Sequence, residues 1–379
     1  MESLAIAVFC WESLHAKRVG GLASAATNLA ETLAQQHHDV HFFTRGSVPD
    51  RTINGVHYHY CQPEGPNIVA YCDSMSCGMV DNFHRAEKER RFDILHFHDW
   101  HPVQALHRLQ DRDTILTFHS TEFGRSGNVA GDWWEYKEIS GREWYGALVA
   151  KRVTTVSASM KREVMRLYDV PGGKCDVVPN GVVPQQYRTD ADTAATRSAY
   201  GIDPDAPLVL FIGRLEYQKG PDILIDAMRE VKRRHPGARA VVAGDGSMRQ
   251  GLHERAHGLP VTFTGYIADP EYVSLLSACD LVAIPSRNGP FGLVLLEAWS
   301  AERCVIASDT GGLSENIDAF VNGVKVGVGS GPLAEGISAI IDEPWNAGAM
   351  GIRGRAKVER LFLWGPVARQ MTDAYRRVS

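Results

Sequence analysis

Residues Asn288–Glu297 (NGPFGLVLLE) have the composition of a phosphate-binding turn that opens a helix. Pro290 and Gly292 punctuate the turn, and Leu293 begins an apolar stretch typical of a buried helix. The first backbone N–H groups of a helix have no partner within it, so a phosphate can accept hydrogen bonds from them. Glu297 follows about one and a half turns later, where it could accept hydrogen bonds from a ribose. An ordinary strand-to-helix connection with a structural glycine explains the stretch equally well.

Two cations, Arg214 and Lys219, lie in Gly213–Gly220 (GRLEYQKG), directly after an apolar run that ends at Ile212. An arginine fork and a lysine point charge around one turn can clamp a diphosphate. Ligands of open α/β sheets bind at this carboxyl edge of the strands. Two solvated loop charges are the alternative interpretation.

Two further glycine motifs occupy similar places. Gly20-Gly21 precedes a helical pattern, and Gly244 lies in Ala243–Arg249 (AGDGSMR) after an expected strand. Glycine lets a ligand approach the backbone closely, and unpaired amides at a helix start favour an anion. Arg249 occupies the third glycine position of the dinucleotide fingerprint, so GxGxxG is absent. A structural turn explains either motif nearly as well.

Histidines follow two of the expected strands. His96–His101 (HFHDWH) partly matches the HxHxDH pattern of metallo-β-lactamases, but Asp99 stands one position early, so we predict a polar lining and no metal site. His119 ends the strand Thr114–Phe118 and precedes Glu122. Because the carboxyl ends of parallel strands share one sheet edge, we expect His119 to emerge beside Asp99 and the N-terminal glycine loop.

These loops require two series of strands alternating with helices, an α/β arrangement of two doubly wound parallel sheets. The strands of the first series are expected at Leu4–Trp11, Val40–Thr44, Ile94–Phe97, Thr114–Phe118, Arg152–Ser157 and Cys175–Val178. The strands of the second are expected at Leu208–Ile212, Ala238–Ala243, Val261–Phe263, Leu281–Ile284 and Cys304–Ala307. Helices are expected at Pro221–His235, Glu271–Cys279, Leu293–Ala301 and Trp364–Val378.

Composition narrows the class of protein. A chain of 379 residues fits two domains, and 44% hydrophobic with 22% charged residues is typical of a soluble globular protein. The net charge of −5 gives no overall field that would attract nucleic acid or an anionic membrane. Seven cysteines without a CxxC pair indicate reduced, mostly buried thiols. The apolar run Leu4–Cys10 is short for a signal sequence, so we expect a cytoplasmic protein without a transmembrane span.

The order of these motifs resembles the GT4 family of retaining glycosyltransferases, and within it the glycogen-synthase-like branch. The resemblance covers essentially the whole chain. Its elements are Gly20-Gly21, HDWH at His98–His101, TFHS at Thr117–Ser120, PNGV at Pro179–Val182, GRLEYQKG at Gly213–Gly220, AGDG at Ala243–Gly246 and PFGLVLLEA at Pro290–Ala298.

The resemblance implies the GT-B fold, with two facing Rossmann-like domains and a cleft between them. Residues 1–183 would form the acceptor domain, joined by a crossing C-terminal helix at 362–379, and residues 184–361 the donor domain. The implied activity is metal-independent transfer of a hexose from a UDP-, ADP- or GDP-sugar to a hydroxyl acceptor, a saccharide or small molecule. It implies no cofactor and no nucleic acid, and leaves peripheral membrane contact and oligomeric state open.

The resemblance also assigns roles to matching positions. His119, Arg214 and Lys219 would be catalytic, the two cations neutralising the departing diphosphate. The acceptor side would include His98, Asp99 and Glu122. The donor-binding positions would be Gly20, Gly21, Gly213, Arg214, Lys219, Gly244, Tyr266, Ile267, Gly289, Phe291, Gly292, Leu293 and Glu297.

One departure concerns the donor sugar. The family signature has a first Glu, seven intervening residues and then the counterpart of Glu297, and here the first position is Gly289. Asn288 is a conceivable substitute because its amide both donates and accepts. The alternative function is a nucleotide-sugar-binding protein with weak or no transfer; an epimerase or phosphorylase is a third. Aromatic residues at Trp133–Tyr145 could stack on a sugar or pack into the core.

Overall fold

The computed structural model describes residues 3–378, so Met1, Glu2 and Ser379 of the expected domains lie outside the described residues. The chain divides into two units. The first contains Met1–Phe123, Val129–Gly181 and Trp364–Ser379, and the second contains Gly124–Asn128 and Val182–Leu363. The change of unit after Gly181 lies close to the boundary expected at residue 183.

The first unit is built on an eight-stranded sheet with the order β3-β4-β2-β1-β5-β6-β7-β8. Its strands are β1 (Ala5–Phe9), β2 (Asp39–Arg45), β3 (Arg51–Ile53), β4 (Val56–Cys61), β5 (Ile94–His98), β6 (Thr114–Phe118), β7 (Arg152–Thr155) and β8 (Cys175–Val177). Neighbouring strands pair in parallel except β3 and β4. The expected parallel sheet is therefore extended at this edge by one antiparallel strand, which was not predicted. Asn54 and Gly55 both have positive φ, the conformation of a tight hairpin turn.

Phenylalanines join the central strands of this sheet. Phe9 on β1 stacks on Phe43 of β2 and on Phe97 of β5, with ring centroids 5.0 and 4.4 Å apart. All three rings are fully buried, which explains why these strands have nearly continuous apolar sequences.

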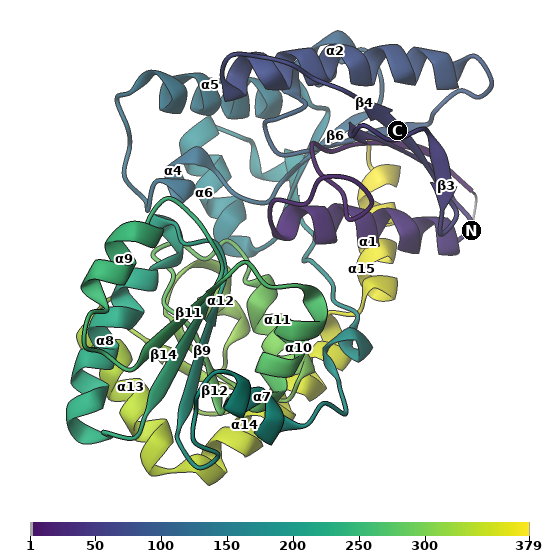
Figure 1. Ribbon diagram of the computed structural model, residues 1–379. Coiled ribbons are helices and arrows are strands. Elements are labelled where there is room, and N and C mark those ends of the chain that lie inside the picture. Colours follow the sequence, from purple (N-terminus) through teal and green to yellow (C-terminus); the bar gives the residue numbers. More distant parts are fainter. Residues whose placement is uncertain (1–2, 379) are drawn as a thin grey trace. The chain divides into compact units, whose positions relative to one another are not determined.

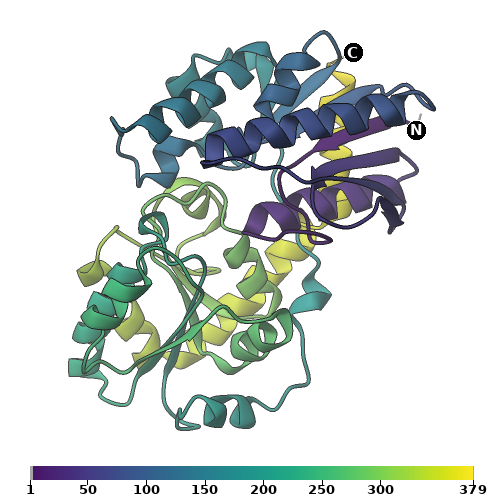
Figure 2. The same cartoon turned by 45° about the horizontal axis from the view of Figure 1, so that its top comes forward.

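Helices cover the first sheet (Figures 1 and 2). They are α1 (Gly21–Gln35), α2 (Ile68–Glu87), α3 (Val103–Arg108), α4 (Glu122–Arg125), α5 (Trp134–Val149), α6 (Ala158–Tyr168), the short η1 (Gly172–Lys174) and α15 (Trp364–Arg376). Helix α15 runs beside α1, and Gln36 donates a hydrogen bond to the Gly365 carbonyl at 2.9 Å. The last helix of the chain thus belongs to the first unit.

The second unit has a six-stranded parallel sheet with the order β11-β10-β9-β12-β13-β14. Its strands are β9 (Leu208–Ile212), β10 (Arg239–Ala243), β11 (Val261–Gly265), β12 (Leu281–Ile284), β13 (Cys304–Ser308) and β14 (Val324–Val326). Its helices are η2 (Pro184–Tyr187), α7 (Thr193–Ala199), η3 (Tyr217–Lys219), α8 (Pro221–Arg234), α9 (Arg249–Arg255), α10 (Asp269–Ala278), α11 (Leu293–Ser300), α12 (Gly311–Asn316), α13 (Ser330–Asp342) and α14 (Pro344–Leu361). Leu224, Val242 and Ile337 belong to its buried core.

Each sheet has a switch point, the place where its strand order reverses. It lies between β1 and β5 in the first unit and between β9 and β12 in the second. In open α/β sheets ligands bind at the carboxyl ends of the strands that flank such a point. The topology therefore identifies one candidate region in each unit.

Two further sequence expectations concern the whole chain. All seven cysteines are free thiols, and Cys10, Cys72, Cys175, Cys279 and Cys304 are buried, which confirms the expected pattern. Among the helices of residues 3–378, none has the length and apolar character needed to cross a bilayer.

Candidate functional site

A buried carboxylate organises the loop that follows β1. Glu12 is 3% exposed, and its Oε2 accepts hydrogen bonds from the Val19 amide at 2.5 Å and the Gly20 amide at 3.0 Å. Burial raises the pKa of Glu12, although these amides and Arg45 oppose the rise. Glu12 thus already binds the amide of Gly20, the residue that precedes α1. Space remains beside Gly20, since no atom lies within 4 Å of where a Cβ would stand.

His119 is held at the end of β6 by two residues that follow β5. Asp99 adopts a left-handed conformation, φ 57°, and its Oδ1 accepts the His119 backbone N–H at 2.7 Å. The Nε2 atom of His119 lies 2.9 Å from His98 Nδ1, within hydrogen-bond distance. Burial lowers the pKa of both imidazoles. At neutral pH His119 is thus a neutral hydrogen-bonding group. Its expected proximity to Asp99 is observed, and the contact with His98 was not predicted.

The histidine considered for metal binding, His96, has both ring nitrogens occupied. Its Nδ1 lies 2.8 Å from the Tyr375 hydroxyl, and its Nε2 lies 2.6 Å from Thr117 Oγ1. Burial lowers its pKa to about 3. His96 therefore links β5, β6 and α15 through a polar network.

Glu122 begins α4, and its backbone N–H donates to Glu143 Oε2 at 2.9 Å. Glu143 is fully buried on α5 and also accepts a hydrogen bond from the Tyr168 hydroxyl. This carboxylate, which sequence reasoning missed, anchors the loop after β6.

The tryptophans of the α5 region do not pack into the core. Trp133, Trp134 and Trp144 are 49%, 53% and 48% exposed. The interpretation of these tryptophans as a buried helix face is therefore wrong.

Glycine backbone joins three strand ends in the second unit. Gly213 donates to the Ala243 carbonyl at 3.0 Å, and Gly244 donates to the Gly265 carbonyl at 2.8 Å. Gly244 has φ 137°, and a Cβ there would lie 1.9 Å from the Gly213 oxygen. Only glycine fits this close approach of β9, β10 and β11.

Lys219 and Arg214 lie in the loop between β9 and α8. Lys219 is half-buried, and burial together with the Arg214 charge lowers its pKa to about 8. Gly220 follows with φ 66°, and a Cβ there would stand 2.1 Å from the Pro285 oxygen. The loop thus brings two cations together at the β9 end of the switch point.

Arg287 braces this loop, a role that sequence reasoning missed. Its guanidinium donates to both carboxylate oxygens of Asp222, at 2.9 and 2.6 Å, and to the Tyr217 carbonyl at 2.9 Å. It also lies 3.8 Å from the centre of the Tyr217 ring. Both charged side chains are largely buried, so the pair fixes the segment that carries Lys219.

The turn before α11 packs against the start of α12. Gly292 caps α11 with φ 96°, as expected of a turn that needs glycine. The Gly312 amide donates to the Gly289 carbonyl at 2.7 Å, and a Cβ at Gly289 would lie 2.6 Å from Leu313 Cδ1. A side chain at Gly289 would therefore have to displace the Leu313 side chain. The contact with Gly311-Gly312 was not predicted.

The neighbouring side chains of this turn are engaged in packing. Asn288 is buried, and its Nδ2 donates to Asn128 Oδ1 at 2.6 Å. Phe291 is also buried and packs edge-on against Phe362. Phe291 can therefore contact a ligand mainly through its backbone, and the Asn288 amide is directed at Asn128.

Glu297 is held by a tyrosine from α10. The buried Tyr272 hydroxyl donates to Glu297 Oε2 at 2.6 Å. Burial and the Glu297 charge raise the pKa of Tyr272, so it stays a donor at neutral pH. Tyr272 gives the carboxylate a fixed orientation on α11.

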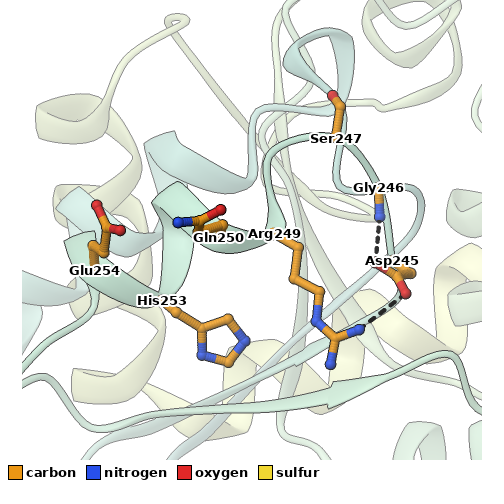
Figure 3. Close-up of a pocket in the computed structure, with 7 residues that line it drawn as sticks. All are labelled: Asp245, Gly246, Ser247, Arg249, Gln250, His253 and Glu254. Atoms are coloured by element: carbon orange, nitrogen blue, oxygen red, sulfur yellow. Dashed lines mark hydrogen bonds and ion pairs between the residues drawn. The ribbon is translucent and has the colours of Figure 1, made fainter.

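A hollow of about 520 Å³ lies beside the AGDG loop. Figure 3 shows its lining, with Arg249 directed at Asp245, where Nη1 and Oδ2 are 3.1 Å apart. Ser247 also donates to both oxygens of Glu216, which ties the AGDG loop to the loop of Arg214 and Lys219. At the adjoining end of β11, Tyr266 is 74% exposed and Ile267 is partly exposed.

Comparison with known proteins agrees with this arrangement. Residues 19–186 match the family described as Glycosyltransferase Family 4, and residues 192–357 match Glycosyl transferases group 1. A glycosyltransferase of Methanocaldococcus jannaschii, itself uncharacterized, is 32% identical over 98% of this chain and 97% of its own. The chain belongs to the GT4 family of glycosyltransferases. The glycogen synthase of Mycobacterium tuberculosis is 30% identical to this GT4 protein, over 94% of the chain and 91% of its own.

Solved structures confirm the expected GT-B fold. Sucrose-phosphate synthase of Thermosynechococcus elongatus superposes on the GT4 protein with a TM-score of 0.83, 24% identity and 99% coverage of each chain. Anabaena HepE in complex with UDP-glucose gives a TM-score of 0.78, with 19% identity and coverage of 99% of this chain and 100% of its own.

Proposed function

We propose that this GT4 protein is a retaining glycosyltransferase that moves a hexose from a nucleoside-diphosphate sugar to a hydroxyl group of a saccharide or small molecule. The observation that carries the proposal is the second-unit switch point. There, Lys219 and Arg214 follow β9, and the glycine turn that follows β12 opens α11, which carries Glu297.

Each part of that arrangement suits a different part of the donor. The backbone amides at Gly292 and Leu293 bind a phosphate, and Glu297, oriented by Tyr272, accepts hydrogen bonds from the ribose. The base lies along Tyr266–Ile267 and the glycine contact of Gly213 with Gly244. The Anabaena protein of the same fold is in complex with UDP-glucose, which supports a UDP-sugar as the first donor to test.

Arg214 and Lys219 supply the charge that the leaving diphosphate requires. As the bond between the anomeric carbon and the phosphate oxygen breaks, negative charge grows on the diphosphate, and two fixed cations stabilise it. This charge stabilisation needs no metal ion. The transfer is proposed to be metal-independent on that ground.

His119 acts on the sugar near the reacting carbon. Because it is neutral and its backbone is fixed by Asp99, it offers a positioned hydrogen-bonding ring. The acceptor oxygen attacks from the face that the phosphate leaves, and a phosphate oxygen takes the proton of the acceptor hydroxyl. Attack from that face retains the configuration of the anomeric carbon.

Residues 1–183, with helix 362–379, form the acceptor domain in this proposal, and residues 184–361 form the donor domain. Gly20 and Gly21 contribute to donor binding in this proposal, and the space beside Gly20 leaves room for a phosphate. His98, Asp99 and Glu122 lie on the acceptor side, where Asp99 works by holding His119. The missing carboxylate at Gly289 alters sugar selection, and membership of GT4 favours transfer over binding alone.

The proposal is tested first by thermal-shift screening with UDP-, ADP- and GDP-hexoses, since a ligand that binds the folded state raises its melting temperature. The selected donor is then incubated with native protein, with His119→Ala, and with His257→Ala as an exposed control. We expect donor turnover in the native protein and the control, and loss of turnover in His119→Ala. Absence of both binding and turnover with every donor would overturn the proposal.

A further inference from the structure

Histidines and aspartates gather at the amino ends of β2 and β4 in the first unit. His41 on β2 pairs in register with His57 on β4, and Asp39 lies two residues before His41 on the same strand. Alternate residues of a strand share a face, so Asp39 and His41 lie together there. His119 follows the carboxyl end of β6, so the group lies at the opposite edge of this sheet, and β1 and β5 lie between in strand order.

Three potential ligand atoms converge in this group. The Oδ1 atom of Asp39 lies 3.6 Å from His41 Nε2 and 3.9 Å from His57 Nε2. All three atoms lie within 4.8 Å of one another. These separations exceed hydrogen-bond length, so no proton is shared between them.

A hydrogen-bond chain sets which nitrogen of His41 carries a proton. The Asp50 carboxylate lies 3.1 Å from His59 Nδ1, and His59 Nε2 lies 2.9 Å from His41 Nδ1. A carboxylate accepts, so His59 Nδ1 donates to it, and His59 Nε2 must then accept from His41 Nδ1. With its proton on Nδ1, a neutral His41 keeps the lone pair of Nε2 available, 3.6 Å from Asp39 Oδ1.

The other two ligands are oriented in a similar way. His57 Nδ1 lies 3.0 Å from Thr52 Oγ1, which leaves Nε2 as its ligand atom. Arg90 donates to Asp39 Oδ2 at 2.8 Å and leaves Oδ1 directed at the histidines. Metal-binding histidines and carboxylates characteristically have such partners for their second atom.

We propose that Asp39, His41 and His57 bind a divalent transition-metal ion of the zinc class. Two imidazoles and one carboxylate are ligands that zinc prefers, at about 2.0–2.2 Å each. In tetrahedral geometry the ligand atoms then stand roughly 3.4 Å apart, so the observed separations of 3.6 and 3.9 Å need only a small contraction. His57 is 47% exposed, which leaves water access to the fourth position.

The test is zinc binding by the full chain, freed of metal by chelator and measured by calorimetry, with the visible spectrum of Co²⁺ as a second readout. We expect one ion per chain and a tetrahedral cobalt spectrum. His57→Ala should weaken binding at least tenfold, while the exposed control His257→Ala should not. Asp50→Asn, which changes the acceptor of the His59 Nδ1–H and leaves all three ligand residues in place, should weaken binding roughly tenfold.

His57 is exposed, so His57→Ala is expected to fold, and its circular dichroism is checked against the control. No saturable binding of Zn²⁺ or Co²⁺, or binding that His57→Ala leaves unchanged, would overturn the proposal. Loss of binding in His98→Ala instead would place the ion at the other histidine group and also overturn it. None of these readouts depends on transferase activity.

Discussion

The low pKa of Lys219 gives donor binding a measurable pH dependence. With a pKa of about 8, the protonated fraction of the free enzyme falls from about 0.91 at pH 7 to about 0.09 at pH 9. The diphosphate of a nucleotide sugar keeps its charge over this range and holds the bound ammonium protonated. The donor dissociation constant should therefore rise about tenfold from pH 7 to pH 9, about 1.4 kcal/mol.

Lys219→Arg separates this effect from other titrations. A guanidinium stays charged to about pH 12, so the affinity of the Lys219→Arg protein for the donor should be nearly constant from pH 7 to pH 9. Calorimetric titration with the donor chosen by thermal shift measures both proteins, and Lys88→Arg serves as an exposed control. A native affinity that does not change with pH, or an unchanged pH dependence in Lys219→Arg, would show that the Lys219 ammonium does not bind the diphosphate.

Further predictions concern catalysis, the donor site and its bracing. His119→Ala should lower kcat at least a hundredfold while donor affinity, measured by calorimetry, changes little. Tyr272→Phe removes the hydrogen bond that orients Glu297 and should weaken donor binding roughly tenfold; unchanged affinity would exclude that role. Arg287→Met should lower the free energy of unfolding by about 2 kcal/mol at pH 7, measured in urea, because it leaves a buried carboxylate unpaired. Burial alone would raise the pKa of Asp222, but the hydrogen bond and charge of Arg287 outweigh burial and hold the pKa below 3.8. The stability difference between native protein and Arg287→Met should therefore shrink as the pH falls below 3.8. A difference that stays constant would contradict the pairing.

Much of the fold could be predicted from the sequence because buried parallel strands are continuous apolar runs. Thr114–Phe118, Leu208–Ile212 and Leu281–Ile284 have the predicted bounds. The strands β3 and β4 escaped prediction, since histidines and tyrosines alternate along β4. The Asn54-Gly55 pair was the available signal for that hairpin. Without β4 the histidine group around His41 could not be recognised.

The candidate site was predictable where one loop carries both a turn and a charge. Arg214 and Lys219 belong to such a loop, and the end of β9 places them at a switch point. Glu12, Tyr272 and Arg287 were not recognised, because each acts on a segment distant in sequence. Burial of a carboxylate or guanidinium depends on tertiary packing, which local residue patterns do not contain.

Gly289 illustrates what packing adds to a motif. The sequence shows only that a carboxylate is missing, whereas the structure shows Leu313 where its Cβ would stand. Gly289→Glu alone would therefore have to displace the Leu313 side chain. Leu313→Ala would open that space, so Gly289→Glu is best examined both alone and combined with Leu313→Ala.

The central claim is that this chain releases a nucleoside diphosphate from a nucleotide sugar by means of His119 and the two cations. The direct measurement is the rate of that release in the presence of EDTA, with the donor selected by thermal shift, for native protein and His119→Ala. We predict release by the native protein, a transferred hexose of retained anomeric configuration by NMR, and at least a hundredfold slower release by the variant. No release by the native protein with UDP-, ADP- or GDP-hexoses, or equal release by both proteins, would contradict the claim.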